Sequence, residues 1–348
     1  MCYSCKVRGT LSNLDANMDR KRIGTARFSL ASAFALASVK FVVGVLSGSL
    51  GVLSSAFDSL ADIFMSAVNL FSIRKSMDPA DTTHPYGHGK VETLATVFQS
   101  LVIGGTGAWV VREGILRLVA GRVPESADAG IVVMGIALAA SWYVSRRIRK
   151  AGEETGSPAL VADSLHFATD VYTNAGILGS LLVFRFTGWA WLDPGVALLV
   201  GAYILFVAGK LLLEAVQDLI DRGLPEETVE IIRRVINDHR PMVVDFHDLR
   251  TRRAGSAKHV DFHLVVCREY KLEDAHRVAD HLEKEIRQVL GNAHVVTHVD
   301  PCRIECPGAD HCERVLRDIR NLGDPGDEKR AEEARPGNDP DSPSRQGV

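Results

Sequence analysis

The sequence is poor in cysteine, in aromatic side chains and in net charge. It has six cysteines among 348 residues, none of them between Cys5 and Cys267, and aromatic residues make up only 7%. The formal net charge is -3, and no basic patch alternates with aromatic residues. This composition argues against a protein that binds nucleic acid. With 46% hydrophobic and 24% charged residues, the chain is too apolar for an ordinary soluble protein and too charged to be all membrane.

Long apolar runs are confined to the first two thirds of the chain. Each run is close to the ~20 residues that a helix needs to cross a bilayer. The six predicted spans are residues 26–46, 51–73, 93–119, 128–146, 158–184 and 193–215. Basic residues cluster before the first span, between the second and third, and after the fourth, so we expect both termini to be cytoplasmic. After Asp221 the closely mixed charges predict a soluble domain.

The cysteines all lie outside the predicted spans, on the side expected to be cytoplasmic. Disulfides are therefore not expected, and free thiols or metal ligands remain. Cys2 and Cys5 have a zinc-like spacing but no second pair nearby. A second group comprises Cys302, Cys306, His311 and Cys312. Whether either group binds metal stays open, because an incidental thiol-bearing tail is also consistent with the pattern.

Two predicted spans carry ionisable residues at helical spacing. The second, in "FDSLADIFMSAVNLF", contains Asp58 and Asp62; the fifth contains Asp163, His166 and Asp170. Offsets of three and four place such residues on one helical face. A carboxylate at the bilayer centre costs roughly 2.5 to 3.5 kcal/mol, and a divalent cation would offset that cost. If the two helices pack face to face, they offer three carboxylates and one imidazole from Asp58, Asp62, His166 and Asp170, a suitable tetrahedral shell for zinc.

The loop after the second span contains a further group of metal-ligand side chains. In "PADTTHPYGHGKVE" these are Asp81, His84 and His88. Histidine and carboxylate so close together are typical of metal sites. A solvated, turn-rich loop with chance histidines is the alternative.

The residues after 221 predict a small α+β domain of order αββαβ, with both helices on one face of a three-stranded sheet. The helices are residues 225–239 and 272–290, the hairpin covers 243–255 and 258–269, and the last strand is 294–301. The positions expected to face the core are Val229, Ile232, Val235, Ile236, Val260, Phe262, Leu264, Val266, Ala275, Val278, Leu282, Ile286 and Val289.

The paired motifs on the second and fifth of six spans resemble those of the cation diffusion facilitator family, in particular its bacterial zinc and ferrous-iron efflux branch. The resemblance covers roughly residues 20 to 302. It implies a transport site formed by Asp58, Asp62, His166 and Asp170, and a peripheral metal site at Asp81, His84 and His88. It also implies that Lys90 pairs with an acidic residue before the soluble domain, for which Asp221 and Asp218 are the candidates.

The soluble domain contains many histidines, and the resemblance separates them. It implies a metallochaperone-like fold that dimerises and holds two metal ions on His247, His263, His276, His298 and Asp300. The unmatched histidines, His239, His259, His281 and His294, are expected at the surface.

These observations predict four regions: an N-terminal arm (1–25), a transmembrane domain (26–220), a metal-binding dimerisation domain (221–302) and a largely disordered tail (303–348). We expect an antiporter, not an enzyme, in the bacterial inner membrane, that exports divalent metal against protons. Zinc is favoured, and Cd²⁺, Fe²⁺, Co²⁺ and Ni²⁺ accept similar ligands. His166 would couple protons to metal, with Asp163 as a relay. The expected partners are metal ions, protons, lipid and a second copy of the chain, with no organic cofactor.

The alternative is a membrane-anchored metal sensor or a metal-dependent hydrolase. A sensor does not require carboxylates inside the membrane. A hydrolytic site needs an open coordination position and a general base near a substrate cleft, and no further motif supplies these. The sequence therefore favours transport.

Overall fold

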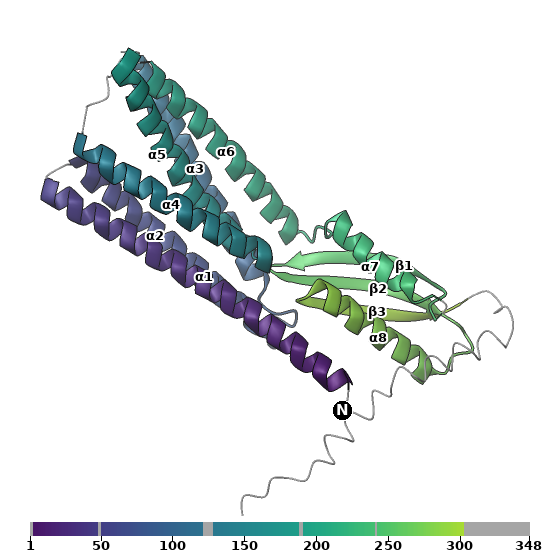
Figure 1. Ribbon diagram of the computed structural model, residues 1–348. Coiled ribbons are helices and arrows are strands. Elements are labelled where there is room, and N and C mark those ends of the chain that lie inside the picture. The colour runs from purple at the N-terminus through teal and green to yellow at the C-terminus, as the bar shows by residue number, and fades with distance from the viewer. Residues whose placement is uncertain (1–2, 48–49, 121–127, 188–190, 241, 303–348) are drawn as a thin grey trace, which may run out of the picture. The chain divides into compact units, whose positions relative to one another are not determined.

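The computed structural model describes residues 3–47, 50–120, 128–187, 191–240 and 242–302 (Figure 1). Some side chains inside the helices, including that of Asp58, also lie outside the description. The chain divides into two compact units. The first comprises Met1–Leu224 and Arg252–His259, and the second Pro225–Thr251 and Val260–Val348.

The first unit contains six long helices, in the order that the apolar runs predict. They are α1 (Tyr3–Ser47), α2 (Leu50–Ser76), α3 (Lys90–Ala120), α4 (Asp128–Thr155), α5 (Pro158–Thr187) and α6 (Leu192–Leu219). The first helix is much longer than the predicted span, because it also includes most of the predicted N-terminal arm. No proline interrupts residues 3–25, so the backbone can continue the helix through this stretch.

Three of these helices are long and apolar enough to cross a membrane within the residues described. They are the segments Asn17–Val43, Lys90–Val119 and Pro194–Leu219, which belong to α1, α3 and α6. Large apolar side chains point outward from the helices, among them Phe64, Trp109 and Phe206, each more than half exposed. An apolar outer surface of this kind suits contact with lipid.

Helix α5 lies at the centre of the packing. It packs closely with α4 and also contacts α3, α6 and α2. Its residues Leu160 and Phe167 belong to a buried cluster with α1, α2 and α4, while Ala162 belongs to a second cluster with α3 and α6. Helix α5 therefore packs against the helices of both clusters.

A buried carboxylate joins three helices near the start of α5. Glu92 on α3 is fully buried and accepts hydrogen bonds from Arg22 on α1 and from Ser157. Ser157 also accepts the backbone N–H of Leu160 at 3.3 Å, as an N-cap residue does. Pro158 follows at the first helical position, where its missing N–H costs nothing. The start of α5 is thus set by local capping and by the Glu92 carboxylate together.

The second unit has the predicted order αββαβ. Its elements are α7 (Glu226–Asp238), β1 (Asp245–Ala254), β2 (Ala257–Val266), α8 (Leu272–Leu290) and β3 (Ala293–Pro301), and the strands pair in the order β1-β2-β3. Both helices contribute to one core with alternate residues of β2, including Phe262 and Leu264. Since all these side chains meet in one core, α7 and α8 cover the same face of the sheet.

One predicted core position of α8 is wrong. Val289 is 52% exposed, although its spacing from Ile286 suggested an inward side chain. Leu290, four residues after Ile286, packs against the core in its place. The last helical turn therefore presents its i+4 position to the sheet, and the helix ends at Gly291 with a φ of 62°.

The tip of the β1–β2 hairpin belongs to the first unit and approaches the start of α3 very closely. Gly255 turns the chain at a φ of 62°, a conformation that glycine adopts without strain. A Cβ atom built on Gly89 would lie 2.4 Å from the carbonyl oxygen of Ala254. His259, expected at the surface, is only 8% exposed here, and its ring meets Tyr86 edge-on at 6.4 Å between centroids.

Replacing Gly89 with alanine should therefore displace the hairpin tip. We expect a loss of about 1–3 kcal/mol in stability, the usual cost of overpacking, read as a lower melting temperature of the full chain in detergent. Gly24→Ala is the matched control, because a Cβ there meets nothing within 4 Å. Equal melting temperatures for Gly89→Ala and the unmodified chain would show that this approach is not a tight contact.

Candidate metal centres

Helices α2 and α5 bring together two of the predicted ligands. The Nε2 atom of His166 lies 2.9 Å from Oδ1 of Asp62. His166 is 8% exposed, so the contact is largely shielded from solvent. Asp170 lies on α5 four residues after His166 and is half-buried. The backbone of Asp58 lies on α2, but its side chain is outside the described part of the structure, so the geometry of a complete four-residue shell stays a prediction.

Asp163 is fully buried one turn before His166. Its Oδ2 accepts a hydrogen bond from Ser29 Oγ of α1 at 2.5 Å, and Ser29 Oγ lies 3.1 Å from Ser66 Oγ of α2. The ionisable residues on this face of α5 are thus connected, through Asp163, to hydroxyl groups on two neighbouring helices. Neither serine was expected from the sequence, because an isolated serine in an apolar run has no distinguishing pattern.

The loop between α2 and α3 forms a compact cluster. Oδ1 of Asp81 lies 3.4 Å from Nδ1 of His84, and Oδ2 lies 3.4 Å from Nε2 of His88. Ligand atoms of all three residues lie within 4.8 Å of one another. His88 is buried, whereas Asp81 and His84 are exposed. The arrangement offers two nitrogens and one oxygen, a set that borderline divalent cations accept.

The Asp81 carboxylate is fixed by its own loop. Oδ1 accepts the backbone N–H of His84 at 2.6 Å, and both the hydroxyl and the N–H of Thr83 at 2.8 and 2.9 Å. These hydrogen bonds, that from His84 first, lower the pKa of Asp81 to about 2. The side chain is therefore ionised at any physiological pH, while Oδ2 faces His88.

A third cluster lies on the sheet of the second unit. Asp300 Oδ2 lies 2.8 Å from Nδ1 of His263 and 3.5 Å from Nε2 of His247, and Asp300 Oδ1 lies 3.5 Å from Nε2 of His298. The ring of His263 is 4.9 Å from that of His247 and 4.8 Å from that of His298, between centroids. The hydrogen bond from His263 lowers the pKa of Asp300.

Strand alternation explains why these four residues meet. His263 alternates along β2 with the core residues Phe262 and Leu264, and so points to the face that the helices leave uncovered. His276, predicted for the same site, is exposed on α8, on the helix-covered side. The described single chain therefore does not bring His276 to this cluster.

Lys90, the first residue of α3, pairs with Asp221. Its Nζ atom donates to Asp221 Oδ1 at 2.9 Å and to the carbonyl of Leu219 at 3.2 Å. The hydrogen bond from Lys90 lowers the pKa of Asp221. The carboxylate of the other candidate, Asp218, lies 3.9 Å from the guanidinium group of Arg253, measured from Oδ2 to Nη1.

A further group was missed in the sequence. His239, His281 and Glu285 place three ligand atoms within 4.8 Å of one another. His281 and Glu285 share a face at helical spacing, but His239 lies more than 40 positions away in sequence, on another element. Of the cysteine groups, Cys302 is buried at the end of β3, while Cys306, His311, Cys312, Cys2 and the side chain of Cys5 lie outside the described residues.

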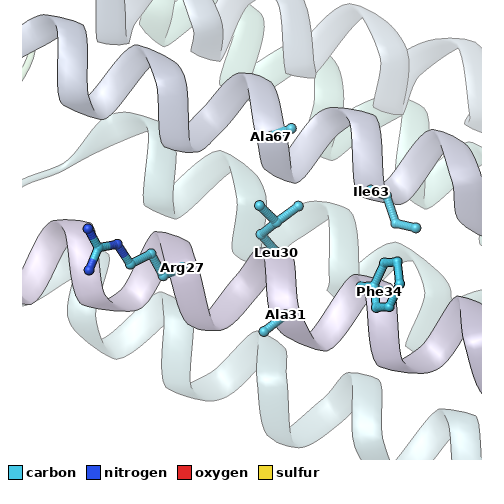
Figure 2. Close-up of a pocket in the computed structure, with 6 residues that line it drawn as sticks. All are labelled: Arg27, Leu30, Ala31, Phe34, Ile63 and Ala67. Atoms are coloured by element: carbon cyan, nitrogen blue, oxygen red, sulfur yellow. The ribbon is translucent and has the colours of Figure 1, made fainter.

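A surface groove between α1 and α2 has no metal-ligand character. It has a volume of about 610 Å³ and is lined by Arg27, Leu30, Ala31, Phe34, Ile63 and Ala67. Figure 2 shows these side chains on the two facing helices, with Arg27 at one end of an otherwise apolar lining. The clusters described above, and not this groove, contain the ligand chemistry.

Two family models match the chain, the cation efflux transmembrane domain over residues 26–220 and the cation efflux protein cytoplasmic domain over residues 224–302. The cation-efflux pump FieF of Shewanella oneidensis is 35% identical over 280 residues, which are 80% of this chain and 94% of that protein. FieF of Pectobacterium atrosepticum is 37% identical over 274 residues, 78% and 91% of the two chains. A solved structure of CzrB in its Zn form is 41% identical and covers 23% of this chain and 92% of that chain, with a TM-score of 0.23. The matched regions together extend over most of the sequence, and the chain belongs to the cation efflux family, the cation diffusion facilitators.

Proposed function

We propose that this cation efflux protein exports divalent metal ions from the cytoplasm in exchange for protons. The observation that carries the proposal is the contact between Asp62 and His166, which joins two helices at 2.9 Å inside the bundle. A carboxylate in a membrane interior is costly unless a cation balances it. A site that alternately holds a metal ion and protons meets that need in both states.

The proposed transport site comprises Asp58, Asp62, His166 and Asp170. One imidazole and three carboxylates form a shell that suits zinc, and Cd²⁺, Fe²⁺, Co²⁺ and Ni²⁺ bind similar ligands. The FieF relatives are named for cation efflux and the CzrB structure for a zinc transporter, and our choice of zinc rests on ligand chemistry.

Protons would enter as the metal leaves, because these ligands bind metal only when deprotonated. His166 is the natural coupling residue, since the reference pKa of histidine, ~6.5, lies within the working range of pH. Asp163 lies one turn away and accepts a hydrogen bond from Ser29, and we propose that it relays a proton along α5.

The two other predicted clusters are proposed as accessory metal sites. Asp81, His84 and His88 would hold an ion at the cytoplasmic loop. His247, His263, His298 and Asp300 would hold metal on the open face of the sheet. His276 lies on the opposite side and would reach such a cluster only in another copy of the chain, which is consistent with a homodimer. In this arrangement the protein lies in the bacterial inner membrane with both termini cytoplasmic.

The test is metal flux into sealed vesicles that contain only the purified protein. An inwardly directed metal gradient with an opposing proton gradient should drive Zn²⁺ uptake, and collapsing the proton gradient should slow it. Metal flux that ignores the proton gradient would remove antiport from the proposal, and absence of flux with intact binding would favour a sensor.

Asp62→Asn should reduce zinc flux by more than about tenfold, because the amide keeps the size of the side chain but removes the charge and one ligand oxygen. Asp78→Asn is the matched control, since Asp78 follows α2, is exposed and pairs with Lys75 at 2.7 Å. Flux near that of the control would show that Asp62 is not a ligand.

His166→Asp should change metal preference and pH dependence together. An all-oxygen shell lacks the nitrogen ligand that favours zinc over manganese, so we expect the ratio of Zn²⁺ to Mn²⁺ flux to fall. The pH dependence of flux should flatten, because the titrating imidazole is gone. Competition flux at several pH values measures both. A ratio and a pH profile like those of the unmodified protein would exclude His166 from the shell.

The double variant His263→Ala, His298→Ala should lose part of the stabilisation that zinc confers while retaining some transport. When the free zinc concentration is 100 times the dissociation constant of a site, binding adds about 2.7 kcal/mol to the free energy of unfolding. This appears as a rise in melting temperature. His294→Ala is the control, an exposed histidine of the same unit that belongs to none of the clusters described here. The cluster does not bind zinc if both variants show the same rise.

A further inference from the structure

Helices α7 and α8 carry a cluster that the proposed transport function does not use. His239 caps the C-terminus of α7, while His281 and Glu285 lie one turn apart on α8. Nε2 of His239 lies 3.1 Å from Oε2 of Glu285, and Nε2 of His281 lies 3.6 Å from the same oxygen. The two imidazole rings are 5.2 Å apart between centroids.

The position of the hydrogen on the neutral ring of His239 follows from the contact of Nδ1, the nitrogen that does not face Glu285. Nδ1 lies 2.8 Å from the carbonyl oxygen of Val235. A carbonyl oxygen only accepts, so Nδ1 carries a hydrogen and donates it. In the neutral ring, Nε2 then presents a lone pair to the Glu285 carboxylate. A histidine anchored through one nitrogen to a carbonyl, with the other nitrogen directed at a ligand position, has the arrangement common among metal-binding histidines.

The contact between Nε2 and the carboxylate requires a positive charge between them or on the ring. A proton would satisfy it by making His239 an imidazolium. Nε2 of His281 lies 3.6 Å from the same Glu285 oxygen, beyond hydrogen-bond distance, so a proton on His239 explains one contact but not the convergence of all three groups.

We propose that His239, His281 and Glu285 form a separate binding site for Zn²⁺ or a similar borderline divalent cation. Two imidazole nitrogens and one carboxylate oxygen are a known ligand set for zinc, with a fourth position left for water. The site would be independent of the cluster at Asp300, because the core of the second unit separates the helices from the open face of the sheet. It would join the end of α7 to the middle of α8.

A metal ion at this site would fix the positions of the two helices of the second unit relative to each other. The helices pack mainly through apolar side chains, which hold them together without fixing one end against the other. A metal ion shared by both helices would fix the C-terminus of α7 at one position along α8. The second unit would then be stabilised by cytoplasmic zinc whether or not the α2–α5 pair transports it.

The test counts zinc bound by the full-length chain in detergent, by equilibrium dialysis and elemental analysis. His281→Ala and Glu285→Gln should each bind about one zinc ion fewer per chain than the unmodified protein, because each removes one of three ligands. His294→Ala should bind the same number as the unmodified protein. Glu285→Gln keeps the size of the side chain, and so decides the question should His281→Ala fail to fold.

A second measurement separates this site from the sheet cluster. In a chain that carries His247→Ala, His263→Ala and Asp300→Asn, zinc should still raise the melting temperature, and adding Glu285→Gln should reduce that rise. If Glu285→Gln instead lowers the melting temperature without metal and leaves the zinc count unchanged, Glu285 only pairs with a protonated His239, and the proposal is overturned. An unchanged count in both single variants overturns it equally.

Discussion

The buried carboxylate of Glu92 on α3 holds together the ends of several helices of the bundle. It accepts from Arg22 of α1 and from Ser157 at the start of α5, and Arg22 also reaches Ser76 of α2 at 3.3 Å. Removing one partner of a buried ion pair costs roughly 3–5 kcal/mol, because the other charge is left in an apolar surrounding. Hydrogen bonds between charged and polar side chains therefore hold these helices together near Glu92. Elsewhere along the helices, much of the packing is between apolar side chains.

The same requirement for a partner explains the polar residues further along α5. Asp163 accepts a hydrogen bond from the hydroxyl group of Ser29, and the ring of His166 contacts the carboxylate of Asp62. Each polar contact joins α5 to a different neighbour, so a change of charge at one of them alters the attraction between two helices. Under the proposed function, binding of protons or metal would change the charge at these contacts and so the attraction between the helices.

Much of this arrangement was predictable because local spacing carries it. The residues of α5 share a face through offsets of three and four. The residues around Asp300 were expected from the family resemblance, and strand alternation explains why their side chains lie on one face. The αββαβ order and nearly all the core positions of the second unit follow from the same periodicities. Arg22 with Glu92, and His239 with Glu285, could not be predicted, because each pair is far apart in sequence and meets only through helix packing. The prediction for Val289 was wrong because spacing does not say which of two neighbouring residues, Val289 or Leu290, points inward in the last helical turn.

The turn around Asp81 has a consequence for kinetics. Three donors within the loop hold one carboxylate oxygen and make the group a weak base. A weakly basic carboxylate donates less electron density to a bound cation, so it forms a labile bond. A metal ion at the site proposed for this loop would therefore be held weakly by the carboxylate and would exchange quickly.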